Sequence, residues 1–189
     1  MEWNDGKARC AWANPHNPTY LAYHDREWGV PCHDDGRLFE MLVLECFQAG
    51  LSWECILNKR EAFRRAFAGF DLDAVAAFGP ADVERLMADA GIVRNRRKIE
   101  AAIGNARAFR AIQREFGNFD AYLWGWTGGE VVREAGLASS PLSDAVSADL
   151  RRRGMRFVGT TVTYAYLQSV GVIWSHDEGC FLHEEKAGK

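Results

Sequence analysis

Apolar residues recur along most of this chain at the spacing of an α-helix. From Arg37 to Ala49 nearly every position is apolar, which is typical of a helix buried at the centre of a domain. Gly50 interrupts the pattern, and Ser52 is placed to cap a second helix that runs to about Phe67. The first third of the chain therefore predicts two consecutive helices, the first of them central.

The next helices are predicted from start and stop signals as well as from periodicity. FGPADVERLMADAG (78–91) has Pro80 at a first helical position and Gly91 at the stop. From Arg94 to about Glu115 the chain forms a longer helix with an apolar stripe. That stripe consists of Ile99, Ala102, Ile103, Ala106 and Phe109. A short aromatic segment, FDAYLWGW, then leads into a loop that ends at Pro141.

A final pair of helices is separated by a very short link. Ser143 can cap a helix through about Arg153, which Gly154 would end in the left-handed conformation. Thr160 starts another helix that ends near Gly171. No strand alternation, repeat or low-complexity tract is visible, so the sequence predicts an all-α fold. With 189 residues, 48% of them apolar, we expect residues 1–189 to form a single compact unit.

Charge distribution and cysteine content bear on the possible partners and the cellular compartment of the protein. The net charge is -3, yet two basic clusters stand out, RNRRK (94–98) and RRRGMR (151–156). They form either a basic face on an acidic body or ordinary cationic helix ends. No secretory signal is visible, and the most apolar stretch is interrupted by Glu45 and Glu54, so no membrane span is predicted. Five cysteines, an odd number, favour the reducing cytoplasm.

The link before Thr160 is a candidate phosphate-binding site. A glycine before a helix start, here Gly159 followed by Thr160 and Thr161, exposes backbone N–H groups that suit a phosphate oxygen. Arg156 and the three arginines at 151–153 lie beside it in the sequence, and together they suit a DNA backbone. The alternative is an ordinary αα-hairpin, which the FVG turn alone does not exclude.

Possible metal ligands occur near both ends of the chain. They are Cys10 and His24 near the start, and His176 and Cys180, four residues apart, near the finish. Two thiolates and two imidazoles make a closed tetrahedral zinc site with a structural role, which would join the two ends. The competing ligands, which leave this assignment open on spacing alone, are His16, Cys32, His33, Cys55 and His183.

A carboxylate in the central helix is a third candidate. Glu40 and Glu45 both lie in FEMLVLECF, which has little polar face. A buried carboxylate must pair with a cation, donate as a neutral acid or line a pocket. Helical geometry does not choose between the two residues. YLAYHDREWGVP (20–31) and the seven tryptophans of the chain indicate either an aromatic core or side chains that stack on a flat ligand.

Four segments together resemble the 3-methyladenine DNA glycosylase I family, of the helix-hairpin-helix superfamily. They are YLAYHDREWGVP, LFEMLVLECFQAGLSW, DAGIVRNRRKIEAAIGNAR and RFVGTT, and the resemblance runs from RCAW (9–12) to GC (179–180). It implies a helix-hairpin-helix fold whose termini, about 8–35 and 172–184, are joined by one structural zinc ion. The ligands would be Cys10, His24, His176 and Cys180, and the hairpin region would span about 143–171.

The resemblance also implies roles for the aromatic and acidic residues. Glu45 matches the glutamate that recognises the base, Trp53 the stacking tryptophan, and Leu51 the side chain that fills the vacated stack. The aromatic pocket wall would consist of Tyr20, Tyr23, Trp28 and Trp12. RFVGTT matches the hairpin that holds phosphates, so its contacts would come from Arg156, Gly159, Thr160 and Thr161.

The activity implied is excision of 3-methyladenine from alkylated double-stranded DNA by a monomer. Methylation makes the base cationic and a good leaving group, so an ionised Glu45 would recognise it rather than act as general base. Asp177 follows a proposed metal ligand, and we expect only a minor role for it. TTVTYAYLQ contains no lysine for a Schiff base, so no lyase activity is expected. The alternatives are a non-catalytic zinc-stabilised module that binds damaged DNA and a catalytic metal centre.

Overall fold

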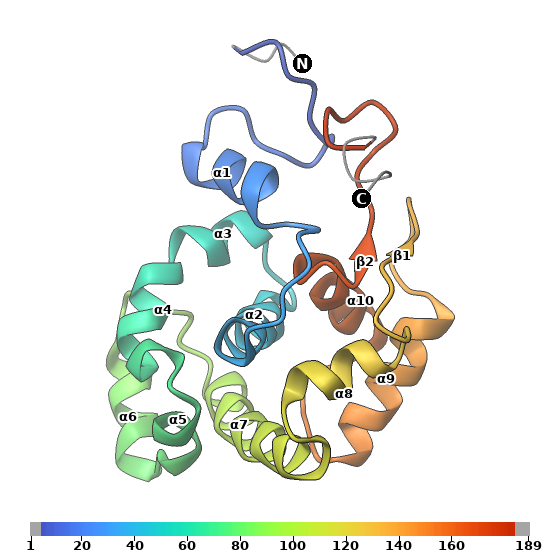
Figure 1. Ribbon diagram of the computed structural model, residues 1–189. Coiled ribbons are helices and arrows are strands. Elements are labelled where there is room, and N and C mark those ends of the chain that lie inside the picture. The colour runs from blue at the N-terminus through green and yellow to red at the C-terminus, as the bar shows by residue number, and fades with distance from the viewer. Residues whose placement is uncertain (1–4, 184–189) are drawn as a thin grey trace.

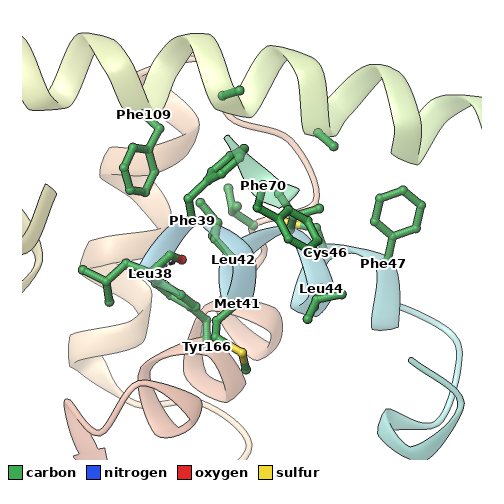
Figure 2. Packing of buried hydrophobic residues seen from close by; sticks show 14 of the residues in the cluster. Leu38, Phe39, Met41, Leu42, Leu44, Cys46, Phe47, Phe70, Phe109 and Tyr166 are labelled. Atoms are coloured by element: carbon green, nitrogen blue, oxygen red, sulfur yellow. Dashed lines mark hydrogen bonds between the residues drawn. The ribbon is translucent and has the colours of Figure 1, made fainter. Parts of the chain in front are cut away.

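The central helix of the fold is α2 (Asp35–Gln48), which is buried at every position from 38 to 47 in the computed structural model. The structure describes residues 5–183. Side chains of α2 point toward Phe109 of α7 (Arg96–Phe116), toward Phe70, and toward Tyr166 of α10 (Thr160–Ser169) (Figure 2). The apolar sequence at 37–49 thus predicted the helix that forms the centre of the core.

The other elements pack around α2 in two groups (Figure 1). On one side lie α1 (Pro18–Arg26), α3 (Trp53–Asn58), α4 (Arg60–Ala66), the 3₁₀ helix η1 (Ala68–Phe70), α5 (Leu72–Ala77) and α6 (Pro80–Ala88). On the other side lie α8 (Phe119–Gly125), α9 (Pro141–Arg152) and α10. α7 runs along the base of both groups and contacts α2, α5, α6 and α8. In residues 5–183 no helix is both long and apolar enough to cross a membrane.

Most helices begin at a polar residue whose side chain accepts a backbone N–H of the first turn. These capping residues are Asn17, Asp34, Ser52, Asp71, Asn95, Asn118 and Ser140. A cap of this kind stabilises a helix by about 1 kcal/mol, so the helix starts are encoded locally. Ser52 caps α3 as predicted, whereas α10 begins after Gly159, which has no side chain to serve as a cap.

The prediction of an all-α fold needs one correction. Two short strands, β1 (Val132–Arg133) and β2 (Ile173–Trp174), pair in parallel, with Val132 opposite Ile173. Two residues are too few to produce a visible alternation of apolar and polar positions, so these strands could not be predicted from the sequence pattern. The pairing fixes the segment that follows α10 next to the loop that follows α8.

The single helix predicted from Ser52 to about Phe67 is also wrong, because the structure has two helices there, α3 and α4. The chain leaves the helix at Lys59, where α3 ends and α4 begins in a new direction. The turn lets Arg60 and Arg64 reach Glu40, with Nε to Oε1 distances of 2.7 and 2.8 Å. The break in the helix thus coincides with ion pairs to a distant segment, which a local helical pattern does not encode.

Two predicted helix ends differ in detail from the structure. Ser140 rather than Ser143 caps α9, and Ser143 lies third in that helix, where its Oγ accepts the Ser140 N–H. Gly154 has the predicted left-handed conformation, with φ of 91°. Gly91 does not end α6, which stops at Ala88. A Cβ at Gly91 would lie only 3.0 Å from the Ala62 side chain, so close packing explains this glycine.

The two ends of the described chain lie side by side at one pole of the molecule (Figure 1). The Phe181 N–H donates to Ala8 O at 2.8 Å, and the Ala11 N–H donates to Asp177 Oδ2 at 2.8 Å. These contacts fall within the predicted terminal segments 8–35 and 172–184, of which residue 184 lies outside the described residues. The termini are thus joined by hydrogen bonds between segments more than 160 positions apart in the sequence.

Candidate functional site

A cavity of about 230 Å³ opens beside the middle of α2. Its walls come from α1 and the segments on either side of it, from α2, from the first residue of α3 and from α10. The lining residues are Trp12, Tyr20, Tyr23, Trp28, Glu45, Gln48, Trp53, Ala165 and Gln168. The structure thus brings together all five aromatic residues named from the sequence and the glutamate at 45.

The aromatic rings of the cavity pack on one another and hold the walls in place. Trp12 lies edge-on to Trp28 with ring centroids 4.8 Å apart, and it lies 5.4 Å from Tyr20. Tyr23 lies 5.3 Å from Trp53. Such pairs add about 0.5–1.5 kcal/mol each beyond simple burial. The cavity is therefore a preformed slot with flat aromatic walls, a shape suited to a planar ring.

Glu45 supplies the carboxyl group of this cavity, and it is 3% exposed. Within the described part of the chain its Oε2 has no hydrogen-bond partner, and neither does Trp53 Nε1. Burial raises the pKa of Glu45 to about 8, because no cation compensates for the loss of water. A buried carboxyl without a partner is costly, and it is explained if a ligand supplies the missing donor.

Glu40, the other candidate, has a different environment. Its carboxylate accepts hydrogen bonds from Arg60 and Arg64. Although burial acts in the opposite direction, these hydrogen bonds hold the pKa of Glu40 below its usual value. Glu40 therefore fits the structural interpretation of a carboxylate paired with arginines. The two environments distinguish Glu40 from Glu45, which helical geometry alone could not do.

Four buried side chains, Cys10, His24, His176 and Cys180, form a potential metal site at the joined termini. Their ligand atoms all lie within 4.8 Å of one another. His176 Nδ1 lies 3.4 Å from both sulfurs, and His24 Nε2 lies 3.6 Å from Cys180 Sγ. Ligand bonds of about 2.0 Å to nitrogen and 2.3 Å to sulfur require tetrahedral edges of about 3.5 Å, so the cluster fits a tetrahedral metal ion.

Neighbouring residues orient the ligands of this cluster. His24 Nδ1 lies 2.8 Å from Asp25 Oδ1, which leaves Nε2 directed at the cluster. Asp177 donates its backbone N–H to Cys10 Sγ and accepts the Ala11 N–H through its carboxylate. Its side chain is thus engaged in joining the termini. Of the competing ligands His16, Cys32, His33, Cys55 and His183, none belongs to the cluster within residues 5–183.

The link between α9 and α10 presents an exposed turn. Gly159 and Thr161 are exposed, and Thr160 Oγ1 lies 2.9 Å from Ser143 Oγ. Arg156 is exposed beside them, while Arg153 is engaged by Asp149 and Glu115. A hollow of about 460 Å³ is lined by Arg97 of one basic cluster and by Arg151 and Arg156 of the other. One arginine of the first cluster and two of the second therefore lie around one hollow, which Glu100 also lines.

Leu51 lies at the tip of the loop between α2 and α3. Its side chain is 41% exposed, which is unusual for leucine in a chain with a large core. Gly50, with φ of 80°, makes the turn that lifts it out. An exposed apolar side chain next to the cavity has the position that a residue inserted into a base stack needs.

Sequence reasoning missed two residues that line the cavity from α10. Ala165 and Gln168 follow Thr161 by four and seven positions, so they lie on the same face of the helix. One face of α10 therefore runs from the exposed turn to the cavity. This periodicity was available in the sequence, and the apolar character of the helix obscured it.

The chain is similar in sequence and in structure to known methyladenine glycosylases. Residues 12–183 match the family model described as methyladenine glycosylase. DNA-3-methyladenine glycosylase 1 of Escherichia coli (strain K12) is 46% identical over 91% of this chain and 95% of that protein. A crystal structure of 3-methyladenine DNA glycosylase I superposes with a TM-score of 0.89 at 44% identity, over 93% of this chain and all of the other. The Staphylococcus aureus enzyme, solved to explain 3-methyladenine recognition, gives 0.87 at 33% identity, over 91% of this chain and 94% of that one.

Proposed function

The chain belongs to the methyladenine glycosylase family, and from that premise we propose that it excises 3-methyladenine from alkylated double-stranded DNA. Hydrolysis of the N-glycosidic bond would release the free base and leave an abasic site, as base-excision repair requires. The observation that carries the proposal is the Glu45 carboxyl at the wall of an aromatic cavity, whose Oε2 has no hydrogen-bond partner among residues 5–183. DNA binding through the backbone alone would need neither feature.

The aromatic slot explains selection of a methylated base. The target nucleotide leaves the stack to reach the cavity, and damaged bases unstack at lower cost. Tyr23, Trp28 and Trp53 would surround the flat ring, and aromatic faces bind a cationic ring better than a neutral one. Methylation at N3 gives adenine this positive charge and also weakens its bond to the sugar.

The protonation state of Glu45 sharpens the recognition step. The sequence predicts an ionised carboxylate, but burial raises the pKa of Glu45 to about 8, so the free protein would hold this group mostly protonated at pH 7. A cationic base in the cavity would favour the carboxylate, because an opposite charge lowers the pKa of an acid. Glu45 would then accept a hydrogen bond from the N6 amino group at the N6 and N7 edge of the base, and its negative charge would balance that of the base.

The reaction would depend little on an acid–base residue at the sugar. Asp177 is held at the joined termini by Ala11, and α10 carries no lysine that could form a Schiff base. The charge of the substrate base supplies the driving force for bond breakage. The enzyme would therefore act on alkylated bases with weakened bonds and would cleave no strand.

A zinc ion is the metal that best suits the cluster of Cys10, His24, His176 and Cys180. When bound, it would supply a structural crosslink, since four protein ligands leave no open position for catalysis. Burial raises the pKa of the Cys10 thiol in the absence of a cation, and a zinc ion would stabilise the thiolate instead. The free thiols also agree with action in the reducing cytoplasm.

DNA would be held as a duplex by the exposed turn and the loop at Leu51. Backbone N–H groups at Gly159, Thr160 and Thr161, with Arg156 beside them, would bind phosphates of one strand. Leu51 would fill the space that the extruded base leaves. Both features lie on one chain, so we propose that a monomer is sufficient.

One assay tests the proposal directly. DNA treated with a methylating agent is incubated with the protein, and released bases are separated by chromatography. Release of 3-methyladenine is expected from the natural chain. Tight binding of the alkylated DNA without any release would favour the alternative of a non-catalytic binding module.

A further inference from the structure

Two buried polar residues of α7, Lys98 and Asn105, face the two loops proposed to meet DNA. They are seven residues apart, which is two helical turns and a rise of about 10.5 Å. Lys98 is 6% exposed and Asn105 is 1% exposed. The apolar stripe of the same helix fills the core, so these two polar side chains need their own explanation.

Lys98 holds the end of α2 from which the Leu51 loop departs. Its Nζ donates to Phe47 O at 2.8 Å and to Ala49 O at 2.6 Å, two carbonyls that the helix itself leaves without partners. No carboxylate lies within ion-pair distance of it among residues 5–183, and burial lowers the pKa of Lys98. The negative end of the α2 dipole is thus its main electrostatic partner.

Asn105 holds the link between α9 and α10 by its backbone. Its Nδ2 donates to Arg156 O at 2.9 Å, and its Oδ1 accepts the Arg156 N–H at 2.8 Å. The next residue, Phe157, has φ of 57°, a conformation that residues other than glycine rarely adopt. The paired hydrogen bonds from Asn105 therefore hold the turn in a shape that it would not favour by itself.

The two contacts are joined through further residues. Lys98 Nζ lies 6.0 Å from the ring centroid of Phe157, so the same ammonium that holds the Leu51 loop also faces the turn. Asn105 Nδ2 also lies 3.7 Å from Sγ of Cys46, the residue next to Glu45. Lys98 and Asn105 thus connect the Leu51 loop, the turn and the segment of α2 that carries Glu45.

We propose that Lys98 and Asn105 are positioning residues that fix the spacing between the Leu51 loop and the Gly159 turn. This inference rests on the proposed function, because it concerns how one duplex meets both elements. With the spacing fixed, Leu51 enters the stack and the turn binds the backbone at the same time, while the extruded base reaches the cavity that Glu45 lines. Preorganised elements bind more tightly because less order must be gained on binding.

The test compares two kinds of binding in Lys98→Met and Asn105→Leu. The first is the affinity for free 3-methyladenine, followed by tryptophan fluorescence. The second is the affinity for a duplex with a tetrahydrofuran abasic-site analogue, followed by fluorescence anisotropy. We expect free-base affinity within about twofold of the natural chain and duplex affinity lowered at least about tenfold, since the cavity remains and only the spacing of the loops is lost.

Arg107→Met is the matched control. Arg107 also lies on α7 and also donates to backbone carbonyls, those of Ala76 and Phe78, but these lie at the far end of α5. Its duplex affinity should be unchanged. Equal losses of both affinities in the Lys98 and Asn105 variants would indicate general destabilisation and overturn the proposal, as would unchanged duplex affinity. If either variant fails to fold, Lys98→Gln and Asn105→Asp are measured in its place with the same criteria.

The abasic duplex keeps this test separate from the proposed function. A natural chain that releases no 3-methyladenine would contradict the function, while the comparison of duplex affinities would still decide the role of the two residues. A natural chain that releases the base, with variants unchanged in duplex binding, would contradict the positioning role alone.

Discussion

The ring of His176 lies edge-on against Trp28, with the two centroids 4.6 Å apart. The ring of His24 contacts that of Trp12 at a tilt of 58°, with the centroids 5.1 Å apart. Both histidines belong to the potential metal site, and both tryptophans line the cavity. The site at the termini and the cavity are therefore two sides of one wall. We expect a displacement of either histidine to shift the tryptophan that packs against it.

Loss of the metal should disorder the cavity. We expect Cys180→Ser, or the natural chain after treatment with a strong chelator, to lose zinc and to bind free 3-methyladenine at least about tenfold more weakly. The physical reason is that a metal bound by His24 and His176 would fix the two imidazole rings against which Trp12 and Trp28 pack. Zinc content by atomic absorption and a fluorescence titration with 3-methyladenine measure the two effects together.

The matched control for this prediction is Cys55→Ser. Cys55 is a free cysteine of α3 outside the cluster, so both zinc content and base affinity should stay normal. A natural protein that contains no zinc when purified without chelator would contradict the metal assignment. Zinc loss with unchanged base affinity would instead contradict the shared wall.

Glu45→Gln should retain the fold yet lose most excision activity. The amide keeps the size of the side chain but cannot balance a cationic base, so we expect single-turnover release of 3-methyladenine to fall by about two orders of magnitude or more. Glu40→Gln is the comparison, because Glu40 is paired with Arg60 and Arg64 rather than facing the cavity. It should lose stability, by about 3–5 kcal/mol if the buried pair is broken, with recognition of the base retained. Near-normal turnover in Glu45→Gln would rule out its role.

The same residue predicts a dependence of stability on pH. Glu45 has a pKa of about 8 when folded and about 4.3 when unfolded. The folded state thus holds a proton that the unfolded state releases, and the contribution of Glu45 to stability is full below pH 4.3 and is lost as pH rises to 8. Relative to Glu45→Gln, the natural chain should become less stable from pH 5 to 8, by up to a few kcal/mol, and the difference should level off above pH 8. Urea unfolding of both proteins across this range measures it.

Much of the fold follows from local signals in the sequence. Asp34, Ser52 and Asn95 mark helix starts because a short polar side chain can satisfy backbone N–H groups there. The continuous apolar run of α2 marks the centre of the core. The distant pairing of Cys10 with His176 came from residue types and a family resemblance rather than from spacing, and the structure places the two residues together.

Other features depend on contacts between distant segments and could not be predicted. The break at Lys59 accompanies the ion pairs of Glu40 with Arg60 and Arg64, and Val132 of β1 pairs with Ile173, 41 positions later in the chain. In the sequence Lys98 is one of several cations in a basic cluster. Its role depends on the end of α2, whose Phe47 carbonyl it contacts only in the folded chain. Polar residues buried by tertiary packing thus leave no periodic signal of their own.

Trp53 should contribute to base binding by stacking. We expect Trp53→Ala to weaken binding of free 3-methyladenine by about 1–3 kcal/mol, the usual worth of one base on one aromatic ring. Trp53→Phe should recover part of this loss. Trp126→Ala serves as control, since Trp126 is 38% exposed and lies outside the cavity. Equal effects in the Trp53 and Trp126 alanine variants would contradict stacking in the cavity.

Variants of Asp177 test whether its carboxylate has a structural or a catalytic role. Its Oδ2 accepts the Ala11 N–H, and an asparagine in its place could still accept that hydrogen bond. We therefore expect Asp177→Asn to keep its zinc and to release 3-methyladenine within about fivefold of the natural rate. Asp177→Leu removes the acceptor, so it should loosen the termini and lose zinc and activity in parallel. A fall of about a thousandfold in Asp177→Asn, with zinc and free-base affinity intact, would show that this carboxylate acts on the sugar or on the attacking water.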